Sequence, residues 1–372
     1  MKKLLFGTTS MVAAGMLAGG AVAADKIQLG VGGYFQAFFA VGDEDDGDGE
    51  GAAGRRDHGI FREAEIIFNG KTTLDNGIEV GVQVQLEAET CTDQIDESFI
   101  YFEGGFGRIN IGQENSGPYL QHRGVSSVAD GLNSPNFRFY AAPAGAGVTT
   151  TATPPNQTSD SEKITYFTPR LFGVQLSASY TPDRCEERSQ STGAGSCGGS
   201  FSGFQSEEDT GQQSEVIEVG ANYVQKFNDF SVALSASYGE ADREGPDTTT
   251  SDDLEEYAFG GELGYAGFTL GAAYRNNNNG LDDDGDRDDY AVSLKYTTGP
   301  WGASVMYVMT EQEVTGGDED EFSGFEVAGS YNIGPGITLA GGVQFVEIED
   351  AAGDDAQEND AVIGYIGTKI SF

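Results

Sequence analysis

A strict alternation of apolar and polar residues recurs along this chain and constrains its fold more than any other feature. From residue 78 to residue 88 the even-numbered positions are Ile, Val, Val, Val, Leu and Ala, whereas the odd-numbered positions are Glu, Gly, Gln, Gln and Glu. The pattern returns at 174–180, 230–238 and 290–297. Because successive side chains of a β-strand point to opposite faces, each segment predicts a strand with one apolar and one polar face.

Alternation alone does not distinguish a membrane barrel from a soluble β-sandwich, because the strands of both alternate. The lengths of the connections between the strands do distinguish them. Tight turns are expected at 75–77, 104–105, 169–171, 228–229, 266–267, 298–300 and 334–336. Long connections rich in Gly, Asn and Asp lie at 42–57, 92–96, 114–160, 183–213, 241–253, 279–286, 315–321 and 349–359. Short and long connections alternate strictly, as in barrels with short periplasmic turns and long external loops. Fifteen connections join sixteen strands, so we predict an all-β, 16-stranded antiparallel transmembrane β-barrel.

Aromatic residues flank five of the tight turns, as expected for rings at a membrane–water interface. The pairs are Phe102 and Phe106, Phe167 and Phe172, Phe227 and Phe230, Tyr265 and Phe268, and Tyr296 and Trp301. Lipid offers no hydrogen bonds, so an open sheet edge cannot lie in it. The first predicted strand, at about 26–41, must therefore pair with the last, at about 360–372.

The first 23 residues resemble a secretory signal peptide. Lys2 and Lys3 form a positive start, residues 4–20 are mostly apolar or small, and Ala21-Val22-Ala23 is a cleavage motif. We expect segment 1–23 to be removed, leaving 24–372 as the barrel. No later stretch has 18 consecutive apolar residues, so the sequence predicts no transmembrane helix.

The charge and the histidine content of the chain argue against nucleic-acid binding and against enzymatic activity. Its formal net charge is −40, and it has no basic patch for nucleic acid. With only His58 and His122, no histidine stands beside a nucleophile in a recognisable motif, so we expect no enzymatic activity. The acids form clusters between the predicted strands, which favours charged loops around a rigid scaffold over a disordered chain.

One acidic cluster offers oxygen ligands at a spacing that suits Ca²⁺ weakly. Asp282, Asp284 and Asp286 alternate in this cluster, but the run lacks the full spacing and the final Glu of an EF-hand loop. A solvated acidic loop is the simpler interpretation. Divalent cations that bridge such acids to lipopolysaccharide phosphates are the alternative.

Several local motifs resemble those of the alphaproteobacterial porins, a branch of the general diffusion porins. They are Asp75-Asn76-Gly77, the stretch 93–97, the segment 104–108 followed by 111–114, and the C-terminal Phe372, an assembly signal common in outer-membrane proteins. The resemblance implies a homotrimer in a Gram-negative outer membrane, in contact with the lipid bilayer and lipopolysaccharide. It also implies a water-filled channel for passive diffusion of ions and small hydrophilic solutes.

The resemblance further implies an inward-folded third external loop, at 114–160, that narrows the pore. Acids on this loop face bases on the opposite wall in that family, so Glu114 and Asp130 are candidate acids, with Arg62 and Arg108 as candidate wall bases. We expect a preference for cations. Two alternatives stay open: a substrate-specific channel on the same barrel, or a structural surface protein or adhesin.

Cys185 and Cys197 predict a disulfide, because eleven residues separate them and the compartment is oxidising. Closing this loop is expected to stabilise the protein by roughly 3 kcal/mol in the chain-entropy model. Mass spectrometry of unreduced peptides should find the two cysteines linked and Cys91 free. Two free thiols at these positions would remove the prediction.

Overall fold

The computed structural model describes the chain in ten segments, which are 26–46, 56–88, 94–134, 139–140, 146–184, 213–243, 252–281, 285–314, 318–353 and 357–372. The predicted signal peptide, Cys185, Cys197, Asp282 and Asp284 lie outside the described residues.

Sixteen strands account for most of the described chain. They are β1 (Gln28–Asp46), β2 (His58–Thr73), β3 (Glu79–Glu87), β4 (Ser98–Gly104), β5 (Gly107–Gln113), β6 (Glu162–Phe167), β7 (Val174–Asp183), β8 (Gln213–Phe227), β9 (Phe230–Arg243), β10 (Leu254–Tyr265), β11 (Phe268–Asn277), β12 (Arg287–Thr298), β13 (Trp301–Val314), β14 (Asp318–Gly334), β15 (Ile337–Glu349) and β16 (Asn359–Ser371). The one helix among the described residues is α1 (Gly117–Gln121). No described helix has the length and apolar character needed to cross a membrane.

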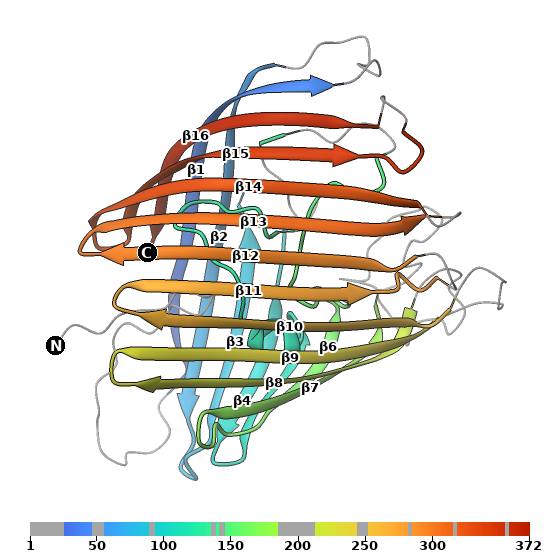
Figure 1. Ribbon diagram of the computed structural model, residues 1–372. Helices are drawn as coiled ribbons and strands as arrows, with labels where there is room; N and C mark the ends of the chain where they lie inside the picture. The colour runs from blue at the N-terminus through green and yellow to red at the C-terminus, as the bar shows by residue number, and fades with distance from the viewer. Residues whose placement is uncertain are drawn as a thin grey trace.

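Every strand pairs antiparallel with its neighbours in the sequence, and β1 pairs with β16 to close the barrel (Figure 1). The backbones of Gly33 and Phe372 exchange two hydrogen bonds of 3.1 Å at this closure. The predicted 16-stranded antiparallel barrel is thus confirmed. All short turns lie at one end of the molecule, which we call the turn end, and the strand ends that lead into the long connections lie at the other, the loop end (Figure 1).

Two strands extend further into acidic sequence than predicted. β1 continues to Asp46, which pairs with Asn359, although residues 42–57 were expected to be a loop. β14 already begins at Asp318, inside the expected loop 315–321. Carboxylates can stay hydrated at the rim of a barrel, so acidic residues there do not prevent the backbone ladder from continuing.

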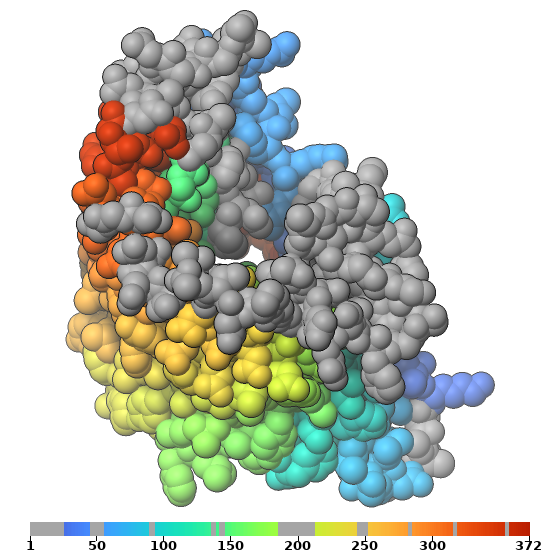
Figure 2. Space-filling view, turned by 90° about the vertical axis from the view of Figure 1, so that its right-hand side faces the viewer, coloured from blue at the N-terminus to red at the C-terminus, as the bar shows by residue number. Residues whose placement is uncertain are grey.

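The strands bury their polar face and expose their apolar face, the reverse of a soluble protein. In β7, Val174 and Leu176 are exposed, whereas Ser177 and Ser179 are buried. Exposed rings such as Phe227, Phe268 and Trp301 lie beside the turns. Apolar side chains therefore cover the outside of the barrel, and the buried set defines an inner face. Figure 2, which looks onto the loop end, shows an opening near the centre of the ring.

Candidate functional site: the inner face of the barrel

The connection between β5 and β6 is hydrogen-bonded along the inner face of the barrel in strand order. The backbone N–H groups of Gly117, Arg123, Ser126 and Val128 each donate to a serine hydroxyl on a different strand. The acceptors are Ser179 on β7 at 2.8 Å, Ser235 on β9 at 2.8 Å, Ser293 on β12 at 3.0 Å and Ser304 on β13 at 3.0 Å. We call the four acceptors, Ser179, Ser235, Ser293 and Ser304, the serine ladder. It satisfies backbone donors that no regular secondary structure pairs.

Glycines on the inner face leave room where this connection crosses the strands. A Cβ atom at Gly260 of β10 would overlap the carbonyl oxygen of Arg123, and one at Gly271 of β11 would lie 2.5 Å from the carbonyl oxygen of Gly124. Side chains at these two positions would push the connection away from the wall. The sequence of the strands therefore matches the path of a segment more than a hundred residues earlier in the chain.

Beyond the serine ladder, the connection continues to β14, β15 and β16. Glu326 of β14 accepts from the backbone N–H of Gly131 at 3.0 Å, from the Tyr365 hydroxyl at 2.7 Å and from the Gln344 amide at 2.9 Å. The Lys369 ammonium donates to the carbonyl oxygen of Ala129 at 2.8 Å. A charged carboxylate that accepts several hydrogen bonds holds its partners more firmly than a neutral acceptor does.

Aromatic packing holds residue Phe139 of the connection against the wall. The ring of Phe139 stacks on Tyr365 at 4.6 Å and meets Phe61 of β2 edge-on at 5.2 Å and Phe38 of β1 at 5.9 Å. Phe38 is 1% exposed. This part of the interior is therefore a hydrophobic core, although the sequence pattern predicts a polar inner face. Burying such rings stabilises the packed arrangement by roughly 1.5–3 kcal/mol each.

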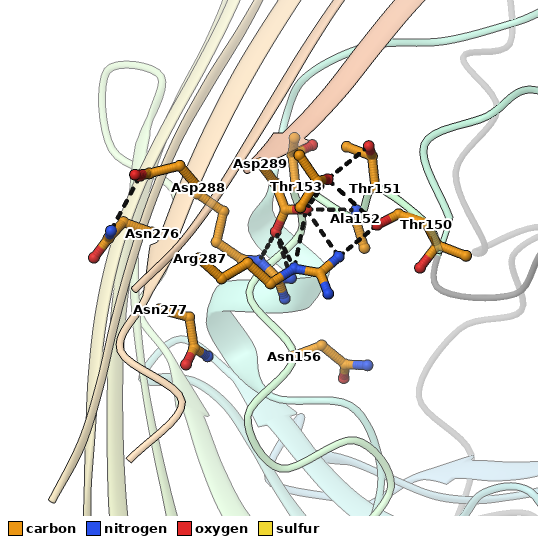
Figure 3. A network of polar contacts seen from close by, with 12 residues as sticks. Thr150, Thr151, Ala152, Thr153, Asn156, Asn276, Asn277, Arg287, Asp288 and Asp289 are labelled. Carbon is orange, nitrogen blue, oxygen red and sulfur yellow. Dashed lines mark hydrogen bonds and ion pairs between the residues drawn. The ribbon is translucent and has the colours of Figure 1, made fainter. Parts of the chain in front are cut away.

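An ion cluster anchors the return of the connection toward β6 (Figure 3). Asp289 of β12 is fully buried and pairs with Arg275 at 2.6 Å and with Arg287 at 3.1 Å. Its carboxylate also accepts from the backbone N–H of Ala152 at 3.3 Å, while Arg287 donates to the carbonyl oxygen of Thr150 at 2.5 Å. A buried acid with two guanidinium partners avoids the large penalty of an unpaired buried charge.

Lys163, in β6, joins the two ends of the connection. Its ammonium donates to the carbonyl oxygens of Ser159 at 2.8 Å and Ser161 at 2.6 Å, and also to that of Glu114 at the start of the connection. Three donors meet three acceptors, so the buried ammonium is fully hydrogen-bonded.

The predicted pair Glu114 and Arg108 lies on one wall and does not face across the interior. The Asn110 amide of β5 donates to the Glu114 carboxylate, while its carbonyl oxygen accepts from Arg108 at 2.7 Å. Arg108 also stacks 4.0 Å above the ring of Tyr101 and lies 3.7 Å from Glu103. Burial raises the pKa of Glu114 to about 7, so its carboxylate is only partly charged near neutral pH.

The other two predicted residues are far from this wall. Asp130 donates its backbone N–H to the Tyr365 hydroxyl at 3.3 Å, and burial raises the pKa of its carboxyl group to about 7. Arg62 is exposed and pairs with Ala37 in the β1–β2 register, on the same face as the exposed Phe35 and Phe39. Arg62 therefore points outward, whereas a wall base must point inward. Its strand does not alternate cleanly, which is why its direction could not be read from the pattern.

Sequence reasoning missed a group of acids on the inner face of β2 and β3 and in the connection after β3. This acidic wall consists of Glu63, Glu65, Glu87, Asp96 and Glu97. Carboxylate oxygens of Glu65, Glu87 and Asp96 lie within 4.8 Å of one another, and the Tyr34 hydroxyl lies 2.8 Å from Glu63 and 2.7 Å from Glu65. Burial raises the pKa of Glu97 to about 7. The spacing of Glu63 and Glu65 was the available signal, since residues two apart share a face of a strand.

Two predicted sites are described only in part. Of the possible Ca²⁺ ligands, Asp286 alone belongs to the described residues, and its carbonyl oxygen accepts from the backbone N–H of Glu313 at 2.9 Å. Phe372 lies at the β1–β16 closure, where its backbone pairs with Gly33. The Ca²⁺ site and the role of Phe372 in assembly stay predictions.

Replacing Lys163 with Met should loosen the whole connection, because three buried carbonyl oxygens would lose their donor. We expect faster hydrogen exchange of the backbone amides in 117–134, equivalent to about 1–3 kcal/mol of lost protection. Lys71→Met is the matched control, because Lys71 is exposed and forms a surface pair with Glu79. Unchanged exchange in Lys163→Met would show that this lysine does not hold the connection.

Solved structures of barrels with the same fold cover nearly the whole chain. An anion-selective porin from Comamonas acidovorans matches with a TM-score of 0.61 and 15% identity, over 93% of this chain and 100% of that one. The trimer form of OmpT, an outer-membrane protein of Vibrio cholerae, matches with a TM-score of 0.59 and 12% identity, over 94% and 100%. A variant of the Rh. blastica porin matches with a TM-score of 0.52 and 16% identity, over 93% and 100%.

At these identities the solved structures establish the fold alone, and comparison with curated proteins finds no match. A family model gives the stronger result, because the model described as Gram-negative porin matches residues 7–351. This family and the closed barrel point to a channel in the outer membrane and not to an enzyme. The chain therefore belongs to the Gram-negative porin family.

Proposed function

We propose that this porin admits ions and small hydrophilic solutes by passive diffusion, with the β5–β6 connection narrowing the lumen and cations preferred. The observation that supports the narrowing is the ordered series of hydrogen bonds from the connection to inner-face side chains of β7 through β16. A segment held along the interior in this way reduces the free cross-section. Selectivity in a pore is set mainly where it is narrowest.

Liposome swelling with sugars of graded size tests the proposal against its alternatives. A general porin admits the sugars in order of size, a substrate-specific channel departs from that order, and an adhesin admits none. The family and fold favour the first two outcomes over the third, because they point to a channel. A barrel that admits no solute would overturn the proposed function.

Selectivity does not follow from this fold, since the matched Comamonas acidovorans porin is described as anion-selective. We assign the cation preference to the acidic wall, with a smaller contribution from Glu114 and Asp130. Glu114 is buried, whereas Glu63, Glu65 and Glu87 are half-buried on the inner face, as Asp130 is in the connection. Carboxylates that line a low-dielectric passage concentrate cations locally.

Removing charge from the acidic wall should weaken the preference for cations. We expect Glu63→Gln with Glu65→Gln to reduce the reversal potential in a steep KCl gradient by a factor on the order of 2. The double variant Glu114→Gln with Asp130→Asn is the comparison and should change it less. Anion selectivity in the unmodified protein would contradict the preference itself. If the second variant reduces the reversal potential more than the first, Glu114 and Asp130 are the main source of the cation preference.

The cation preference should also weaken on acidification. The pKa values of Glu97, Glu114 and Asp130 are each raised to about 7, chiefly by burial, so these groups are charged above that pH and neutral below it. Their negative charge is lost as the pH falls from about 8 to about 6, a range in which ordinary exposed carboxylates stay ionised. Reversal potentials measured across this range should decline, and a flat profile would contradict the assignment.

We also propose a homotrimer, in which β1 to β5 and β16 of one barrel face its neighbours. Ile111 of β5 is 43% exposed on the outer face, and Ala37, Ile109, Gly33 and Gly364 are small or apolar residues on the same group of strands. Replacing Ile111 with Arg should dissociate the trimer, because a charge buried between barrels without a partner is strongly unfavourable. Electrophoresis without heating measures the outcome, and an intact trimer would exclude this interface.

A further inference from the structure

Basic side chains gather near the turn end of the barrel, away from the acidic wall. Six of them lie close to a short turn or to the C-terminus. They are Lys71, Arg108, Arg170, Lys226, Lys295 and Lys369, which we call the basic belt. The belt draws on β2, β5, β8, β12, β16 and the turn between β6 and β7, so it surrounds the lumen.

The alternation along each strand places these side chains on the inner face. Lys295 shares its face of β12 with Ser293 of the serine ladder. Lys226 shares its face of β8 with Asn222, whose amide donates to the carbonyl oxygen of Gln121 at 3.2 Å. Arg170 donates to the Gln175 side chain at 2.7 Å, on the inner face of β7.

Part of the belt keeps a net positive charge. Lys71 is paired with Glu79 at 3.0 Å, and Arg108 lies 3.7 Å from Glu103. Among the described residues, no ion pair involves Arg170, Lys226 or Lys295, and Arg170 and Lys226 are exposed. Glu262, on the inner face of β10, and Asp229, in the β8–β9 turn beside Lys226, are acids at this end that offset them in part.

The loop end of the lumen has the opposite sign. The acidic wall lies at that end of β3 and beside the middle of β2, and the pairing register joins Glu65 to Glu87 far from the 75–77 turn. The buried acid Glu218 lies at the same end of β8. Of the bases at this end, Arg275 is paired with both Asp289 and Glu256, and Arg287 is paired with Asp289.

We propose that the lumen is a bipolar pore, with a cation-attracting zone at the loop end in series with an anion-attracting zone at the basic belt, and that it rectifies ion current. The inference rests on the proposed channel function. When the loop side is positive, cations enter through the acidic zone and anions through the basic belt, so both accumulate where the zones meet. When the loop side is negative, both ions leave that region and the conductance falls.

The rectification should depend on the salt concentration, because salt screens the fixed charges of the pore. Fixed charges act across a pore only when the Debye length is comparable with the pore radius. That length is about 30 Å in 0.01 M salt, about 10 Å in 0.1 M and about 3 Å in 1 M. Rectification should therefore be strong in dilute salt and vanish in concentrated salt, whereas a mechanical gate would respond to voltage in both.

Single channels in planar bilayers test the proposal. In 0.01 M KCl we expect a conductance higher by a factor on the order of 2 with the loop side positive, and nearly equal conductances in 1 M KCl. The variant Lys226→Gln with Lys295→Gln should bring the low-salt ratio close to one. Its matched control, Lys226→Arg with Lys295→Arg, keeps both charges and should keep the ratio.

The orientation of each channel can be read from Gly105→Cys, made in a background with the three native cysteines replaced by Ser. A side chain at Gly105, in the β4–β5 turn, meets no atom within 4 Å. After biotinylation, streptavidin binds only from the chamber that faces the turn end.

The measurements distinguish failure of the proposed function from failure of the bipolar pore. Absence of ion conduction would overturn the proposed function. A conducting channel with equal low-salt conductances at both polarities, or with the opposite polarity favoured, would overturn the bipolar pore alone. Rectification that persists in Lys226→Gln with Lys295→Gln would overturn the assignment of the anion-attracting zone to these two lysines.

Discussion

The structure depends on one constraint, which is that lipid cannot satisfy a backbone hydrogen bond. Every strand must therefore pair on both sides, and the sheet can end only by closing on itself. The exchange of hydrogen bonds between Gly33 and Phe372 completes that closure. Closure creates an interior that no lipid reaches, and the serine ladder and the Asp289 cluster face that interior. The apolar exterior and the polar interior are thus two results of the same rule.

The interior is shaped by a single connection that interacts with almost the whole wall. The first half of the connection is bound by serine hydroxyls and fits against the wall because Gly260 and Gly271 have no side chain. The second half, which returns to β6, is held by the Asp289 cluster and Lys163. The aromatic core around Phe139 adds apolar packing to this polar framework. Contacts distributed along the connection, from the serine ladder to Lys163, thus hold it against the wall.

Charge in the lumen is organised separately from this framework. Asp289 is ion-paired with two guanidinium groups, and Glu326 accepts hydrogen bonds from neutral donors, among them the backbone N–H of Gly131. The acidic wall and most of the basic belt take no part in these contacts, although Lys369 of the belt also binds the carbonyl oxygen of Ala129. Barrels of one fold can therefore differ in selectivity, because substitutions at such positions leave the backbone ladder unchanged.

The sequence by itself determined the number of strands, their antiparallel order and the end at which each turn lies. Those features depend on alternation and turn residues within a few positions of one another, as at 78–88 and 75–77. Only the tertiary structure decided that Arg62 points outward, that Arg108 and Glu114 share a wall, and that Glu65 meets Glu87. These relations depend on register between strands and on the path of a long connection. A shift of one residue reverses the face of every side chain in a strand, and no local pattern encodes that choice where alternation is imperfect.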